Sequence, residues 1–243
     1  MISIKRVSAA IAASIPLAGA GLAVAEPKIE EEIVVKGQYL SIDEVTALKT
    51  PTPILDVPQS LSIITAEQIS QQGFNAIGDI VNYTPGVSTS QGEGHRDAVV
   101  FRGRRSTADF FIDGVRDDVQ YYRPLYNLEQ VEILRGPNAL FFGRGGTGGA
   151  LNRVSKKGVI GEDFTRYQAS VDTFDSIGLQ IDNNATLNDG TAFRVNAMYE
   201  GLKNHRDFYE GDRFGITPSF RFSLSDDTTV DVSYEYANHE RFI

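Results

Sequence analysis

The last third of the chain alternates apolar and polar side chains with a period of two, segment after segment. In one such segment Tyr167, Ala169 and Val171 share a face opposite Gln168 and Ser170. Successive side chains of a β-strand point to opposite faces, so the pattern predicts strands with one apolar and one polar face. Five strands are expected, around residues 165–173, 177–185, 193–199, 214–224 and 230–236. Segments of about ten residues are long enough for a tilted strand to cross a bilayer.

A soluble antiparallel sandwich and a membrane barrel share this alternation. Aromatic residues gather near the ends of the predicted strands, as they do at the rims of an outer-membrane barrel. Short polar turns at 188–190 and 225–227 fit the periplasmic side, and the charged stretch 202–212 fits an extracellular loop. These features favour the barrel. Pro218 counts against the fourth segment as a central strand, because proline has no backbone amide to donate.

Five strands cannot close a barrel, because single-chain outer-membrane barrels use an even number of about eight or more. An open sheet edge in lipid leaves backbone groups unpaired at a cost of roughly several kcal/mol each. Residues 161–243 are therefore predicted to be the first five strands of a transmembrane barrel, and we expect the sequence to be truncated.

The first 25 residues have the form of an export signal. Lys5 and Arg6 precede an apolar run, and residues 23–25 (AVA) supply a small-x-small cleavage pattern. Cleavage leaves 21 of the 23 basic residues against 32 acidic ones, a net charge of −11 (21 − 32), which argues against a nucleic-acid partner. The absence of cysteine excludes disulfides, zinc–thiolate sites and a lipid anchor on cysteine. Export to the bacterial outer membrane, with lipid as a partner, is the expectation.

Residues 49–160 lack the long alternation and contain short motifs instead. The sequence Thr65–Gln68 (TAEQ) has the form of a capping box and predicts the start of a helix. A second helix is expected from Asn75 to Tyr83, ending before Pro85. Short strands are expected at 60–64, 98–102, 110–112 and 131–134. This pattern predicts a compact α+β domain with a small mixed sheet.

The motifs of this domain resemble, in order and spacing, those of TonB-dependent receptor plug domains. The matching segments are Asp56–Ser60 (DVPQS), Tyr83–Val87 (YTPGV), Phe101–Gly103 (FRG), Ile112–Gly114 (IDG), Leu128–Pro137 (LEQVEILRGP) and Gly148–Lys156 (GGALNRVSK). The resemblance implies an α+β plug domain followed by antiparallel transmembrane β-barrel strands. It also implies an outer-membrane receptor that imports ferric siderophores by energy-coupled active transport.

An N-terminal extension, residues 26–48, carries a segment that resembles the TonB box of this family. Its residues are Glu31, Glu32, Ile33, Val34 and Val35. A short β-branched run can pair edge-on with a partner strand through main-chain hydrogen bonds. The resemblance implies that the periplasmic energy-transducing protein TonB binds there. The alternatives are a leader segment or the first strand of the plug.

Arginines are concentrated in one part of this acidic chain. They are Arg96, Arg102, Arg104, Arg105, Arg116 and Arg123, with Tyr121 and Tyr122 among them. Guanidinium groups and aromatic faces suit an anionic, aromatic iron chelate such as a ferric catecholate, or a hydroxamate.

By the resemblance, ligand contact is expected at Arg96, Arg104, Tyr121 and Tyr122, with a preference for a catecholate-type siderophore. A structural role, locking the plug against the barrel, is expected for Arg102, Glu132 and Arg135. Iron arrives already chelated, so the resemblance implies neither a cofactor nor a metal site of the protein's own.

An enzyme is the main alternative of another class. Gly143–Gly148 satisfies G-x-G-x-x-G, and Glu162 or Asp163 lies near the distance expected for a ribose-binding acid. A dinucleotide site needs a long helix after the glycines, and residues 150–158 are too short and too polar for one. No catalytic triad or carboxylate pair has a local signature. The chain is therefore predicted not to be an enzyme.

The sequence leaves two further alternatives open and disfavours a third. A receptor of the same family could take haem, cobalamin or a glycan. A chain that stops at Ile243 could be a non-transporting remnant or a soluble plug. A passive porin is disfavoured, because a porin has no plug before its first strand.

Overall fold

A computed structural model of the chain describes residues 44–45, 52–53, 56–57, 60–90, 96–106, 109–136, 148–205 and 208–242. These residues all belong to one compact unit, residues 42–243. The predicted signal peptide, residues 1–25, and the predicted TonB box, residues 31–35, lie outside the described residues.

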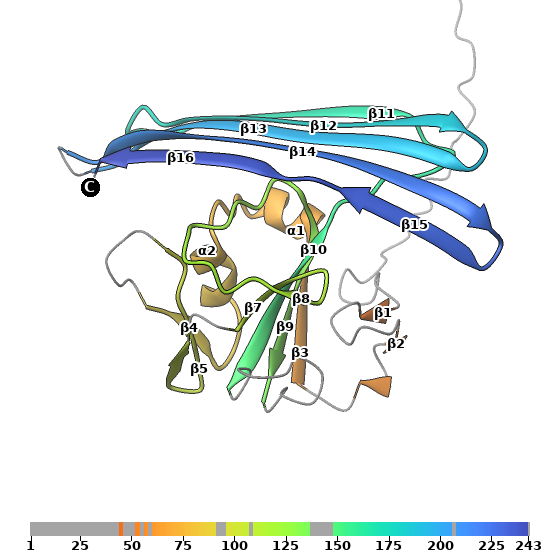
Figure 1. Cartoon of the computed structure of the whole chain (residues 1–243). Coiled ribbons are helices and arrows are strands. Elements are labelled where there is room, and N and C mark those ends of the chain that lie inside the picture. Colours follow the sequence, from red (N-terminus) through yellow and green to blue (C-terminus); the bar gives the residue numbers. More distant parts are fainter. Residues whose placement is uncertain are drawn as a thin grey trace, which may run out of the picture. The chain divides into compact units, whose positions relative to one another are not determined.

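A five-stranded mixed sheet forms the centre of the N-terminal part (Figure 1). Its strand order is β3 (Ser60–Thr65), β9 (Leu128–Arg135), β10 (Gly149–Ser155), β7 (Phe110–Ile112) and β8 (Val115–Arg116). Strand β10 pairs antiparallel with β9 and parallel with β7. The predicted strands in this region are confirmed, whereas β10 was not predicted as a strand.

Two small sheets accompany this central sheet. One pairs β1 (Glu44–Val45) with β2 (Thr52–Pro53), and the other has the order β4 (Val87–Thr89), β5 (Val99–Phe101) and β6 (Arg104–Ser106). All their pairings are antiparallel.

Two short helices, α1 (Ala66–Gln71) and α2 (Ile77–Asn82), cover the core of this domain. The predicted capping box is confirmed: the Gln68 amide donates to Thr65 Oγ1 at 3.2 Å, and the Thr65 amide donates to Gln68 Oε1 at 3.1 Å. Helix α2 is shorter than predicted, and the carboxylate of Asp79 accepts the amides of Asn75 and Ala76 before its first turn. These contacts satisfy amides that the helix itself cannot pair.

The apolar core lies between the helices and the central sheet. Its fully buried members include Ile77, Ile80, Phe101, Phe110, Leu128, Ile133 and Leu151. Gly149 at the start of β10 is required by this packing. A Cβ atom there would overlap the ring of Phe101 and lie 2.6 Å from the carbonyl oxygen of Leu134.

The C-terminal part is a separate antiparallel sheet of six strands (Figure 1). The strands are β11 (Phe164–Val171), β12 (Ile177–Asn188), β13 (Thr191–Lys203), β14 (Glu210–Ser225), β15 (Thr228–Ser233) and β16 (Tyr236–Phe242). The order runs from β11 to β15, and β16 also pairs with β14. The five predicted strands are confirmed, with the fifth divided into β15 and β16.

Pro218 lies where the fifth strand is divided. Ser219 pairs with Ser233 and Ile216 pairs with Tyr236, so β15 and β16 keep one register along β14. The Tyr234 amide donates to the Pro218 carbonyl oxygen at 3.1 Å, and Pro218 has no amide to return the bond. A proline is therefore accommodated in a strand with neighbours on both sides, because the amide that it lacks would have pointed toward the break between β15 and β16.

This sheet exposes its apolar face and buries its polar face, which is the reverse of a soluble sandwich. Apolar side chains lie on the exposed face, including Tyr167 at 78% and Val171 at 80% exposure. Polar side chains lie on the buried face, including Asn184 at 1% and Asn196 at 0%. A sandwich buries its apolar face, whereas a membrane barrel turns that face outward to lipid. This arrangement favours barrel strands.

Among the residues that the structure describes, none belongs to a helix with the length and apolar character needed to cross a membrane.

Candidate functional site

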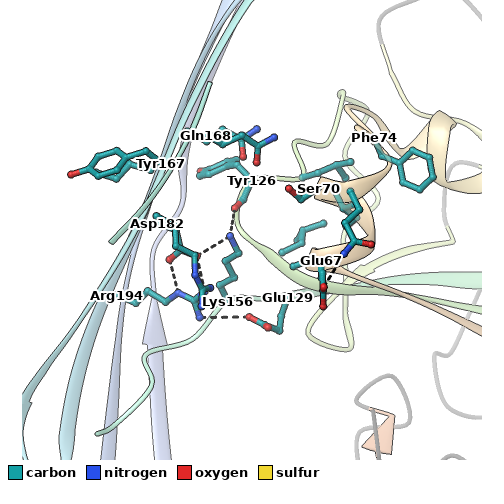
Figure 2. A pocket seen from close by; sticks show the side chains of 18 residues that line it. Glu67, Ser70, Phe74, Tyr126, Glu129, Lys156, Tyr167, Gln168, Asp182 and Arg194 are labelled. Carbon is teal, nitrogen blue, oxygen red and sulfur yellow. Dashed lines mark hydrogen bonds and ion pairs between the residues drawn. The ribbon is translucent and has the colours of Figure 1, made fainter. Parts of the chain in front are cut away.

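A cluster of charges joins the polar face of the strand sheet to the N-terminal domain, which we call the plug (Figure 2). The Arg194 guanidinium donates to both carboxylate oxygens of Asp182, each at 2.7 Å. Lys156 Nζ lies 3.0 Å from Asp182 Oδ2 and donates to the Tyr126 carbonyl oxygen at 2.9 Å. Glu129 of the plug lies 3.5 Å from Arg194. The cluster thus links β9 and the end of β10 to β12 and β13.

Burial lowers the pKa of Lys156, and the carboxylate of Asp182 opposes that effect. A cavity of about 620 Å³ lies beside the cluster, between α1 and strands β11 and β12. Ser70, Tyr126 and Gln168 are among its polar lining groups, while the ring of Tyr167 points away on the far side of the sheet (Figure 2). The cavity wall therefore combines polar and charged groups with apolar side chains, among them Ile69, Leu125 and Ile181.

A second polar contact lies further along the strands. The Tyr126 hydroxyl and Thr217 Oγ1 are 2.7 Å apart, and Asn127 Nδ2 donates to Thr217 Oγ1 at 3.2 Å and to Glu235 Oε1 at 3.1 Å. Gly215 makes room for this contact, because a Cβ there would lie 2.8 Å from the Tyr126 hydroxyl. Burial strongly raises the pKa of the Tyr126 phenol, which stays a neutral hydrogen-bonding group.

The loop formed by residues 117–123 is folded around the guanidinium of Arg123. Its Nη2 donates to the carbonyl oxygens of Asp117 at 2.9 Å and Val119 at 2.7 Å, and its Nη1 donates to that of Tyr121 at 3.3 Å. The guanidinium carbon also lies 3.8 Å from the centroid of the Phe110 ring. One buried side chain therefore satisfies three backbone carbonyls of the loop.

The carboxylate of Asp117 accepts three hydrogen bonds, two from the same loop and one from Arg153 of β10. Asp117 Oδ2 accepts from Arg153 Nη2 at 2.6 Å, from Arg123 Nε at 2.9 Å and from the Tyr121 hydroxyl at 2.9 Å. Burial raises the pKa of Tyr121. Asp97 accepts the Arg123 amide at 2.7 Å, and burial raises the pKa of this carboxyl to about 6 despite the nearby arginines.

The four predicted ligand contacts lie in different surroundings. Arg96 donates a hydrogen bond to Gln120, and Arg104 is exposed on β6. The Tyr121 hydroxyl donates to Asp117 within the loop and accepts from Arg153 Nη2 of β10, each at 2.9 Å.

Tyr122, the next residue, lies against the strand sheet instead. The guanidinium carbon of Arg241 lies 4.5 Å from its ring centroid and 5.6 Å from that of Tyr209.

The predicted structural residues make their described contacts within the plug. Glu132 is fully buried and accepts from Gln130 at 2.7 Å and from Asn152 at 2.9 Å. Arg135 donates to the hydroxyls of Ser60 and Ser62 at 2.9 and 2.8 Å, and burial lowers its pKa. Arg102 is exposed and has a left-handed φ of 49°.

Apart from Tyr122, the plug–strand contacts described above come from residues that the sequence did not single out. They include Tyr126, Asn127, Glu129 and Lys156 on the plug side and Asp182, Arg194, Thr217 and Glu235 on the strand side. The sequence pattern could have identified the strand residues, because all of them lie on the polar face of the alternating strands.

The enzyme alternative meets a structural obstacle. The residues after Gly148 form strand β10 and not the long helix that a dinucleotide site requires.

The fold and this interface define a plug domain packed on strands of the barrel type. Residues 53–150 match the family "TonB-dependent Receptor Plug Domain". This segment is therefore a plug domain of the TonB-dependent receptor type.

The similar proteins are, by name, a TonB-dependent receptor, a siderophore receptor and a ferric-catecholate import receptor. The chain is 34% identical to the probable TonB-dependent receptor BfrD of Bordetella pertussis, over 96% of this chain and 33% of the relative. The structure of the siderophore receptor PiuA of Acinetobacter baumannii matches with a TM-score of 0.74 and 28% identity, over 82% of this chain and 29% of that one. The ferric-catecholate import receptor Fiu of Escherichia coli matches with a TM-score of 0.73 and 27% identity, over 80% and 29%. The chain thus spans about a third of the length of these relatives.

Proposed function

We propose that the chain is the plug-bearing part of an outer-membrane receptor that imports ferric siderophores by active transport. The observation that carries the proposal is the likeness of both plug and strands to PiuA and Fiu, a siderophore receptor and a ferric-catecholate import receptor by title. In the proposed cycle a chelate binds near the 117–123 loop, TonB binds residues 31–35, and force on that segment rearranges the plug.

The polar interface supports a plug that can move. The described contacts between plug and strands include the Lys156–Asp182 ion pair and the Tyr126–Thr217 hydrogen bond. Hydrogen bonds exchanged for bonds to water cost only about 1 kcal/mol each, whereas exposing an apolar interface costs about 25 cal/mol per Å². A plug held by exchangeable polar contacts can therefore be displaced without uncovering a large apolar surface.

A proline at Val34 tests the role of the TonB box. Val34→Pro removes a main-chain donor, so we expect uptake of the ferric chelate to be lost while its binding to cells is unchanged. Val34→Ala keeps the amide and is the matched control, with uptake retained. Normal uptake by the proline variant would overturn the box assignment.

The ligand is tested by direct binding to the protein purified from outer membranes. Ferric tris-catecholate, ferric tris-hydroxamate, haem, cobalamin and an oligosaccharide are compared. We expect binding of an iron chelate, and joint replacement of Arg96 and Tyr121 by Ala to weaken it by about tenfold or more. Tyr83→Ala, at a side chain that is 73% exposed, is the control. Binding of haem, cobalamin or glycan alone would overturn the siderophore assignment.

A further inference from the structure

The guanidinium of Arg153 is buried but only partly hydrogen-bonded. Its side chain is 1% exposed, and its Nη2 donates to Asp117 Oδ2 at 2.6 Å and to the Tyr121 hydroxyl at 2.9 Å. Its Nε and Nη1 have no hydrogen-bond partner among the residues that the structure describes. A buried donor without a partner carries a desolvation penalty, so an arrangement that pairs these two donors is favoured if acceptors lie nearby.

The bonds of Nη2 attach the 117–123 loop to β10. The other two donors to Asp117 Oδ2 are Arg123 Nε and the Tyr121 hydroxyl, and both belong to the loop itself. Arg153 on β10 therefore brings a side chain from outside the loop into its bonding. Release of Arg153 loosens the attachment of the loop to β10 while the bonds inside the loop remain.

Acceptors of the right kind lie toward the strand sheet. Glu235, between β15 and β16, accepts a hydrogen bond from Asn127 Nδ2 at 3.1 Å. Its carboxylate also interacts electrostatically with Arg153. Asn127 is 1% exposed, and its Oδ1 has no hydrogen-bond partner among the described residues. A carboxylate and an amide oxygen therefore match, in number and in chemistry, the two donors of Arg153 that have no partner.

The carboxylates of Asp117 and Glu235 compete for this guanidinium. Both are negative, and the charge of Asp117 acts on Glu235 as the charge of Arg153 does. Placing Asp117 against Arg153 therefore brings two like charges closer together, whereas moving it away relieves that repulsion. One carboxylate is hydrogen-bonded to Arg153 and the other is held at longer range, so the guanidinium has two alternative positions, and this structure shows the first.

We infer that Arg153 is a two-position switch between the 117–123 loop and the strand sheet. In the first position it binds Asp117, and the loop is closed on β10. In the second it binds Glu235 and Asn127 and ties the plug to the strands. The coupling is negative and reciprocal, because closing the loop removes Arg153 from the strands and tying the plug removes it from the loop. Under the proposed function, a chelate that closes the loop also makes the plug easier to displace.

Hydrogen exchange of the loop amides tests the switch. It is measured by mass spectrometry on the protein purified from outer membranes, without a chelate, and reports how often the loop opens. Glu235→Gln keeps the size of the side chain and an oxygen for Asn127, but it removes the charge that draws Arg153 away from the loop. We expect the amides of residues 117–123 to exchange more slowly by about fivefold or more.

Asp231→Asn is the matched control. Asp231 is another carboxylate of the strand sheet, but it pairs with Arg221 at 2.7 and 3.0 Å. We therefore expect its replacement to leave exchange in the loop unchanged.

A second background removes the switch itself. In Arg153→Gln, the further change Glu235→Gln is expected to have no effect on the loop. Circular dichroism verifies that each variant is folded. If Arg153→Gln does not fold, Arg153→Lys takes its place. Its single ammonium keeps the charge without the planar fork, and we expect Glu235→Gln to act more weakly there than in the wild type.

Each outcome decides the matter. Slower exchange in Glu235→Gln that needs the arginine supports the switch. Unchanged or faster exchange in Glu235→Gln overturns it, and so does equal slowing in Asp231→Asn or slowing that persists in full without Arg153. Because no chelate is present, failure here leaves the proposed function standing, and that function is decided by the uptake and ligand-binding experiments.

Discussion

Arg194 and Asp182 form a two-point ion pair, with both nitrogen–oxygen distances at 2.7 Å, on the buried face of strands β12 and β13. Arg221 and Asp231 form the same kind of pair on the same sheet, at 2.7 and 3.0 Å. The two pairs differ in burial, because the Arg194 and Asp182 side chains are 4% and 9% exposed and those of Arg221 and Asp231 are 32% and 28% exposed.

This difference predicts unequal costs for the same substitution. Asp182→Asn leaves Lys156 and Arg194 buried without their carboxylate, and we expect a loss of about 3–5 kcal/mol in the free energy of unfolding. Asp231→Asn is the matched control, with an expected loss below about 1 kcal/mol. Denaturant unfolding of the purified protein measures both, and equal losses would contradict the burial argument.

Two substitutions test the Tyr126–Thr217 contact, one that removes the hydroxyl and one that crowds it. Tyr126→Phe removes the hydroxyl from a buried contact and is expected to cost about 1 kcal/mol of stability. Gly215→Ala brings a methyl group against the same hydroxyl and is expected to cost more, because the plug must shift. Tyr83→Phe, at an exposed ring, is the control. Protease susceptibility of the plug is the second readout, and protection unchanged from wild type in Gly215→Ala would refute the prediction.

Asp97 predicts a pH dependence of stability. Burial raises the pKa of this carboxyl from 3.8 to about 6, so the folded state binds its proton more tightly than the unfolded state. Between about pH 4 and pH 6 the contribution of Asp97 to stability therefore falls as the pH rises, and above about pH 6 the penalty is constant. Asp97→Asn cannot titrate. We expect thermal melting of the variant to show a flatter pH profile than the wild type across this window, and identical profiles would rule the assignment out.

Gly149 predicts a local packing requirement. Gly149→Ala places a methyl group on the Phe101 ring and near the Leu134 carbonyl, so we expect a loss of about 1–3 kcal/mol or more. Gly201 on β13 has no atom within 4 Å of the position a Cβ would occupy, and Gly201→Ala is the neutral control. Thermal unfolding compares the two, and a neutral Gly149→Ala would mean that the strand start can relax.

Elements with a strong local signal were predictable from the sequence. The capping box at Thr65 depends on residues three apart, and the barrel strands depend on alternation, so both were read correctly. Strand β10 was missed because all seven of its residues are buried, which removes the alternation that marks a half-buried strand.

Tertiary context decided the rest. The local argument about Pro218 was correct in saying that an amide is missing, but the sequence does not show that the neighbouring strand is interrupted at the same place. Arg123 looked like one member of a surface group of arginines. Its burial depends on carbonyl groups of the surrounding loop, and composition carries no information on where backbone carbonyls point.

The loop around Arg123 has an evolutionary consequence. Its backbone path is fixed by main-chain carbonyls bonded to one guanidinium and by the Asp117 carboxylate. The exposed side chains of Asp118, Val119 and Gln120 therefore contribute little to fixing that path. Substitutions at these three positions can therefore change the chemistry of the loop surface while the backbone stays in place. Under the proposed function, a lineage of such receptors can in this way change its chelate preference through a few codons, with its scaffold inherited unchanged.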